Sequence, residues 1–141
     1  MKDFFDTSVL VAAFRGTHVH HAASIQLLST ATPKHSACGL HTLAEVYATM
    51  TALPVRPMIP PEQAMLLVEE VQNRLSIISL SGDEYVEAIR AAAAQGFTSG
   101  RVYDSLLLRC AAKSKAQNIY TWNVKHFQST APELASRIRT P

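Results

Sequence analysis

The sequence predicts an α/β fold, with a parallel β-sheet flanked by helices on both faces, in one domain over residues 1–141. Two observations lead to this prediction. Short apolar segments of strand character recur along the chain, and segments with helical periodicity separate them. Strands joined through helices pair in parallel, because each helix returns the chain to the same end of the sheet. No repeat, low-complexity tract or glycine-rich linker divides the 141 residues, which are enough for one buried core.

Four segments are predicted to be strands. They are rich in branched, aromatic or small residues and comprise Asp3–Asp6, His35–Cys38, Ser76–Leu80 and Asn118–Thr121. The second has weak strand propensity, so its assignment depends on the segments around it.

Helical patterns fill the intervals. Apolar residues recur at helical spacing at Ala64, Leu67, Val68, Val71 and Leu75, and the prolines at 54, 57, 60 and 61 mark a loop before them. Ser81 and Glu84 form a predicted capping box for a helix whose inner face is expected to carry Val86, Ile89 and Ala93. The segment Gly96–Gly100 ends that helix, and Arg101–Ala116 is predicted to form the next.

Composition restricts the class of protein. A hydrophobic content of 48% with 17% charged residues is typical of a compact globule, and no apolar run is long enough to cross a membrane. The first residues lack the pattern of a secretory signal. Cys38 and Cys110 lie outside any Cys-x-x-Cys spacing and are expected to be buried, reduced thiols in a cytoplasmic protein.

Charge alone does not identify a partner. The net charge is +2, but six of the residues from Arg109 onward are basic and one, Glu133, is acidic. Such a bias suits a polyanionic partner. On charge alone, an ordinary solvated surface is the favoured explanation.

Three acids, Asp6, Glu45 and Asp104, stand out from the rest. Asp6 follows the first strand, Glu45 lies early in the helix after the second, and Asp104 is in line with Leu107, Leu108 and Ala111 on one helical face. Each has a structural alternative: Asp6 as a helix cap, Glu45 as a first-turn acid favoured by the helix dipole, and Asp104 as a partner of Arg101 or Arg109.

Together the three acids predict a site for a divalent cation. Parallel strands place their carboxyl ends at one edge of the sheet, so we expect the three carboxylates to lie within about 4–8 Å of one another. Like charges that close need a cation, and oxygen ligands favour Mg²⁺ or Mn²⁺. The segment Thr17–His21 carries three histidines but is not expected to bind a transition metal. It is predicted to be a turn and helix start, and no Cys or acid completes a ligand set there.

Four segments in order resemble PIN-domain ribonucleases, and among them the VapC-type toxins of bacterial toxin–antitoxin pairs. They are Phe5–Leu10, Thr42–Tyr47, Tyr103–Leu106 and Ile119–Phe127, and the resemblance covers essentially the whole chain. It implies a Mg²⁺- or Mn²⁺-dependent endoribonuclease that cleaves single-stranded or loop RNA with a metal-activated water, leaving a 5′-phosphate and a 3′-hydroxyl. It also implies a cognate antitoxin and a homodimer, with apolar contact surface around Pro54–Leu75.

Residue by residue, the resemblance implies that Asp6, Glu45 and Asp104 are catalytic and bind the metal. Many members carry a fourth acid where this chain has Asn123 or His126, so Asn123 is expected to be a weak ligand and metal affinity to be low. Hydroxyls that hydrogen-bond near the metal are expected at Thr7, Ser8 and Thr121. The RNA phosphates on either side of the cleaved one are expected to be bound by Arg15, Lys113 and Lys125.

Two other classes stay open at this point. A non-catalytic PIN-like module that binds nucleic acid or protein would use the acids only as caps, and it would tolerate Asp6→Asn. A phosphotransfer domain also carries an Asp after an early strand, but the first strand lacks the Asp-x-Asp spacing of such phosphatases. Trp122 and Tyr103 are candidates for stacking on bases, with core packing the alternative for Trp122.

Overall fold

The computed structural model describes all residues from 1 to 141 and contains a five-stranded, fully parallel sheet. In chain order the strands are β1 (Asp3–Phe5), β2 (Ser36–Gly39), β3 (Ser76–Ile78), β4 (Asn118–Tyr120) and β5 (Ile138–Arg139). Their order in the sheet is β3-β2-β1-β4-β5. The central strand β1 therefore lies between β2 and β4, and the residues that follow these three strands share one edge.

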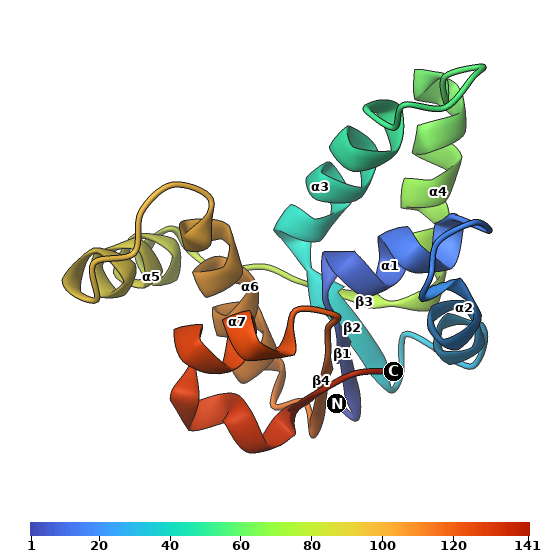
Figure 1. Cartoon of the computed structure of the whole chain (residues 1–141). Coiled ribbons are helices and arrows are strands. Elements are labelled where there is room, and N and C mark those ends of the chain that lie inside the picture. The colour runs from blue at the N-terminus through green and yellow to red at the C-terminus, as the bar shows by residue number, and fades with distance from the viewer.

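Seven α-helices and one 3₁₀ segment cover the sheet (Figure 1). They are α1 (Thr7–Phe14), α2 (His21–Ser29), α3 (Leu40–Thr51), α4 (Pro61–Arg74), α5 (Gly82–Ala94), α6 (Arg101–Ser114), α7 (Val124–Thr130) and the 3₁₀ segment η1 (Pro132–Arg137). Figure 1 shows α3 and α4 side by side, extending away from the sheet to the proline-rich loop that joins them. None of these helices has both the length and the apolar character that a membrane span requires.

Alternate residues of the strands supply two cores, one on each face of the sheet. Phe5 and Cys38 pack with residues of α1 to α4, among them Leu10, Val46 and Val71. Phe4, Ala37 and Ile119 are in register across β1, β2 and β4 and pack with α6 and α7. The predicted α/β fold with helices on both faces is confirmed.

The cysteines are also as predicted. Cys38 and Cys110 are free thiols buried in the two different cores. Burial raises the pKa of Cys38 to about 12 and that of Cys110 to about 11. Both thiols therefore stay protonated and unreactive at neutral pH.

Two expectations about the elements were incomplete or wrong. The two-residue strand β5 was not predicted, because two residues carry no readable alternation. The inner face predicted for α5 is wrong: Ala88 and Ala92 are buried, whereas Val86 is 52% and Ile89 is 41% exposed. Small alanine side chains let α5 approach α6 closely, which turns the larger apolar residues outward. The capping box of Ser81 and Glu84 is confirmed.

Candidate active site

Asp6 directly follows β1 and is 4% exposed. It is the N-cap of α1, and all three of its hydrogen bonds fall on Oδ2: from the Ser8 hydroxyl at 2.7 Å, the Thr121 hydroxyl at 2.9 Å and the Ser8 backbone N–H at 3.4 Å. Its other oxygen, Oδ1, accepts no hydrogen bond from the protein. Asp6 is thus a helix cap with one oxygen left for an additional ligand.

Glu45 lies in the second turn of α3, so the helix dipole at the first turn does not account for it. The Thr7 hydroxyl donates to its Oε1 at 3.2 Å, and His41 Nε2 lies 3.9 Å from the same oxygen. Its side chain is 31% exposed. A hydroxyl and a distant imidazole do not neutralise a carboxylate as a lysine or arginine does.

Asp104 lies in the first turn of α6 and does not pair with either arginine considered from the sequence. Its Oδ2 lies 2.9 Å from Nε2 of His126 on α7. Arg101 instead bonds the hydroxyls of Ser129 and Thr130 and stacks over the Phe97 ring. The partner of Asp104 is therefore an imidazole, which is charged only when it is protonated.

All three acids line one open cavity of about 540 Å³ at the edge where β1, β2 and β4 end. Close packing helps to bring them there: a Cβ on Gly39, at the end of β2, would lie 2.6 Å from Leu107 of α6. A larger residue at position 39 would require the Leu107 side chain of α6 to move.

The acids of this cavity resist ionisation. Burial, together with the charges of Asp6 and Asp104, raises the pKa of Glu45 to about 7. Burial and the charge of Asp6 raise the pKa of Asp104, against the opposing effect of His126. Burial raises the pKa of Asp6 despite its hydrogen bonds from Ser8 and Thr121. A cation would relieve this repulsion.

The donor chemistry fits a divalent metal ion, but the side chains are not yet arranged around one. No three His, Cys, Asp or Glu side chains are placed to hold an ion together. The reason is local, because Glu45 is directed to Thr7 and Asp104 to His126. Both side chains are partly exposed, and the hydrogen bonds from Ser8 and Thr121 to Asp6 fall on Oδ2 and not on Oδ1, so Mg²⁺ or Mn²⁺ fits this set of oxygens.

Of the other residues predicted for the site, those with hydroxyl groups contact the acids. The lysines and arginine predicted to bind phosphates do not. Thr7 bonds Glu45, and Ser8 and Thr121 bond Asp6. The side chain of Asn123, the N-cap of α7, lines the cavity. Lys113 does not line it, since its ammonium donates to Glu84 Oε1 at 2.7 Å and to the Ser79 carbonyl at 3.0 Å. Arg15 ends α1, and Lys125 is exposed in the first turn of α7.

The sequence places His126 where many family members carry an acid, but it did not predict that His126 contacts Asp104 or that His18 and His20 line the cavity. His126 bonds Asp104 from 22 positions away, and no periodicity connects two such positions. His18 and His20 line the cavity. Their segment is the turn and helix start expected from the sequence, because α2 begins at His21. Their ring positions depend on the path of the α1–α2 loop, which the sequence does not specify.

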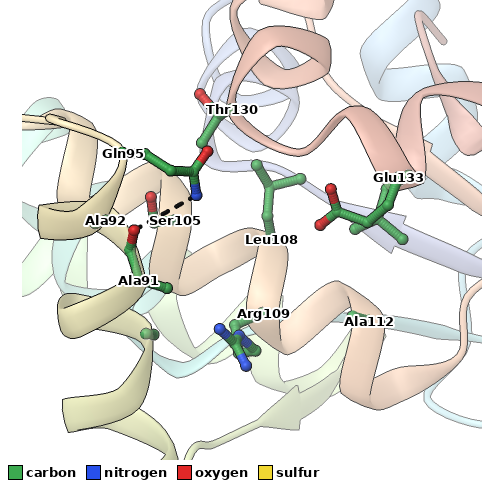
Figure 2. A pocket seen from close by; sticks show the side chains of 11 residues that line it. Ala91, Ala92, Gln95, Ser105, Leu108, Arg109, Ala112, Thr130 and Glu133 are labelled. Carbon is green, nitrogen blue, oxygen red and sulfur yellow. Dashed lines mark hydrogen bonds between the residues drawn. The ribbon is translucent and has the colours of Figure 1, made fainter.

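A second cavity, of about 280 Å³, lies between α5, α6 and the C-terminal turns (Figure 2). Figure 2 shows Ala91 and Ala92 of α5 at one side and Leu108 and Ala112 of α6 at the other. Its ionisable residues are Arg109 and Glu133, which carry opposite charges. This cavity lacks the concentration of like charge that distinguishes the acidic one.

Known structures with the same fold extend over nearly the whole chain. VapC20 of Mycobacterium tuberculosis, a sarcin–ricin-loop-cleaving toxin, has a TM-score of 0.74 at 16% identity, over 92% of this chain and 95% of its own. A toxin–antitoxin complex from Klebsiella pneumoniae has a TM-score of 0.67 at 20% identity, over 99% and 98%. VapBC2 of Rickettsia felis, bound to promoter DNA, has 0.64 at 21% identity, again over 99% and 98%.

The family of the chain follows from its sequence. No curated protein matches it. The family model of the PIN domain matches residues 4–131, which include all three acids, the strands β2 to β4 and all of β1 except Asp3. The chain therefore belongs to the PIN domain family.

Proposed function

We propose that this protein is an endoribonuclease that depends on a divalent cation, Mg²⁺ or Mn²⁺, and cleaves single-stranded or loop RNA in the cytoplasm. The observation that carries the proposal is the cavity of Asp6, Glu45 and Asp104, in which burial raises all three pKa values and repulsion from neighbouring acids further raises those of Glu45 and Asp104. Structural acids are normally placed so that their charge is satisfied. Here the charge is left for a cation that the chain does not supply.

Each residue of the site has a separate proposed role. Asp6, Glu45 and Asp104 would hold the ion, with Asn123 as a weaker oxygen donor. When bound, the ion supplies neutralisation of the phosphate and acidification of the attacking water. Ser8 and Thr121 hold Oδ2 of Asp6 and would leave Oδ1 for the ion. Glu45, with a pKa of about 7, releases its proton on ligation, so metal affinity should rise with pH. Arg15 and Lys125 are the candidates for flanking phosphates.

We further propose that the protein is the toxin of a toxin–antitoxin pair and forms a homodimer. The shared fold with VapC20 and with toxin–antitoxin complexes supports this, as does apolar surface on α4 and on the loop before it. Met58 is 56% and Leu66 is 62% exposed there. Toxicity on expression, relieved by the product of an adjacent small reading frame, is the expected result. A harmless monomer at high concentration would contradict it.

The test of the nuclease is RNA cleavage by purified protein in Mg²⁺, Mn²⁺ or chelator. Asp6→Asn should lower the rate by at least roughly 100-fold, because loss of a ligand exceeds the 10- to 100-fold cost of losing a group that only orients one. Asp3→Asn is the matched control. Asp3 is the buried acid at the other end of β1, where it accepts from Asn118 at 2.9 Å. The products should carry 5′-phosphates.

A non-catalytic binding module is the second candidate. It is favoured by the absence of three side chains already placed around an ion. Wild type that binds RNA without cleaving it in either metal, and Asp6→Asn that binds equally well, would establish this alternative and exclude the nuclease.

A further inference from the structure

Two stacked pairs of rings border the acidic cavity. His20 lies on Trp122 with 3.7 Å between ring centroids and 7° between the planes. His41 lies on Tyr103 with 4.7 Å between centroids and 15° between the planes. Each pair joins segments that are far apart in the sequence.

The two pairs flank the carboxylates. Trp122 follows β4, and His41 lies in α3 after β2, so the two strands on either side of β1 and Asp6 each lead into one pair. His20 and Trp122 line the cavity itself. His41 Nε2 is 3.9 Å from Glu45, and Tyr103 immediately precedes Asp104.

The Trp122 ring is fixed in position by hydrogen bonds. Its Nε1 donates to the buried Ser24 hydroxyl at 2.9 Å. Its backbone N–H donates at 3.0 Å to the Ser8 hydroxyl, which in turn donates to Asp6. The indole is thus oriented relative to the same carboxylate that we propose binds the metal.

The cavity has no permanently cationic side chain to attract RNA. Its lining contains three acids but no lysine or arginine. No lysine or arginine therefore holds the RNA within the cavity, and beside the proposed cation another interaction has to position the bases. Aromatic faces bind unpaired bases of any sequence by stacking.

We propose that the His20–Trp122 and His41–Tyr103 pairs are base-binding platforms, on which unpaired nucleobases on either side of the cleaved phosphate stack. The inference rests on the proposed function and adds to it the groups that select single-stranded RNA. Bases within a duplex are already stacked and paired, so they do not present a free face to these rings.

The test measures binding of a short single-stranded RNA to Asp6→Asn protein, which is expected not to cleave it. Adding His20→Ala or Tyr103→Ala should weaken binding roughly 5- to 150-fold, the range for loss of one base-stacking side chain. Tyr85→Ala on α5 is the matched control, because Tyr85 is 43% and Tyr103 is 45% exposed and Tyr85 does not line the acidic cavity. Tyr103→Phe keeps the ring and should bind as the parent does.

An RNA of the same length without bases separates stacking from charge. The His20 and Tyr103 variants should bind this abasic RNA as their parent does, because it presents phosphates only. Trp122 is the only tryptophan, so its fluorescence should change with normal RNA and not with abasic RNA. Equal loss for both RNAs, or no loss for either, would overturn the platforms.

RNA cleavage by the wild-type protein distinguishes failure of the nuclease proposal from failure of the platform proposal. If wild type cleaves RNA while the His20 and Tyr103 variants bind as tightly as their parent, only the platforms are wrong. If wild type neither binds nor cleaves RNA, both the nuclease and the platforms are wrong.

Discussion

Glu84 and Glu45 are two glutamates near the starts of helices, and they have opposite electrostatic surroundings. Glu84 accepts hydrogen bonds from Lys113 Nζ at 2.7 Å and from the Ser81 backbone at 2.9 Å, and these hold its pKa at about 2. Glu45 accepts from the Thr7 hydroxyl, and burial and two neighbouring acids raise its pKa to about 7.

The difference shows how a structural acid and a site acid are distinguished. The chain supplies a lysine and a backbone donor to Glu84, which closes the capping box of α5 and joins α5 to α6. It supplies no such cation to Glu45, Asp6 or Asp104, although it carries thirteen lysines and arginines. A cation from solution would stabilise three acids left in this state, as we propose.

The largest expected effect is on catalysis. Glu45→Gln should lower RNA cleavage by about 100-fold or more, because it removes a charged oxygen from the proposed metal site. Glu84→Gln should leave the rate unchanged, since Glu84 interacts only with α5 and α6. Initial rates on one RNA at saturating Mn²⁺ compare the two variants, and equal losses would remove the distinction between the glutamates.

A smaller effect, a gain in metal affinity and not a loss of activity, is expected from a substitution at Asn123. Asn123→Asp adds a fourth acid to the cavity and should lower the Mg²⁺ concentration needed for half-maximal cleavage by roughly 10-fold, the scale of one improved ligand. Lys125→Gln, two residues further on, should not alter the metal requirement. An unchanged metal dependence in Asn123→Asp would mean that this side chain does not face the ion.

The smallest effect is on stability in the absence of metal. Because the folded pKa of Glu45 lies above its ordinary value of 4.5, its favourable contribution is complete below pH 4.5 and is lost as pH rises through about 7. At pH 8 Glu45→Gln should therefore unfold at higher denaturant concentration than wild type, by roughly 1 kcal/mol after solvent screening of a partly exposed group. At pH 5 the difference should be smaller.

Glu84→Gln has the opposite sign in the same experiment. Its pKa is lowered, so its contribution is present above pH 4.5 and lost only as the pH falls toward 2. The variant should be less stable than wild type by the same amount at pH 5.5 and pH 8. A pH-dependent gain in stability in Glu84→Gln, or no gain in stability in Glu45→Gln, would show that the surroundings of the two glutamates are not as described.

The acids of the site were predictable from sequence, and their partners were not. Asp6 follows an apolar strand and Asp104 is in line with an apolar helical stripe, and parallel topology brings such positions to one edge. The Asp104–His126 contact and the His20–Trp122 stack depend on side-chain rotamers and loop paths. No local pattern contains that information.

The helices and strands show the same difference between features that local sequence specifies and features that depend on packing. Strands β1 to β4 and the capping box of α5 carry local signals and were predicted. The inner face of α5 was not, because alanines 88 and 92 alternate with larger apolar residues that give an equally good stripe at 86 and 89. The choice between these stripes is made by how closely α6 approaches.

Direct titration of Mn²⁺ into the purified protein at pH 8 tests the central claim, that the acidic cavity takes a divalent cation. We expect saturable binding to wild type that is at least roughly 10-fold weaker in Glu45→Gln and unchanged in Glu84→Gln. Binding that is equally strong in all three proteins, or absent from wild type, would contradict the claim.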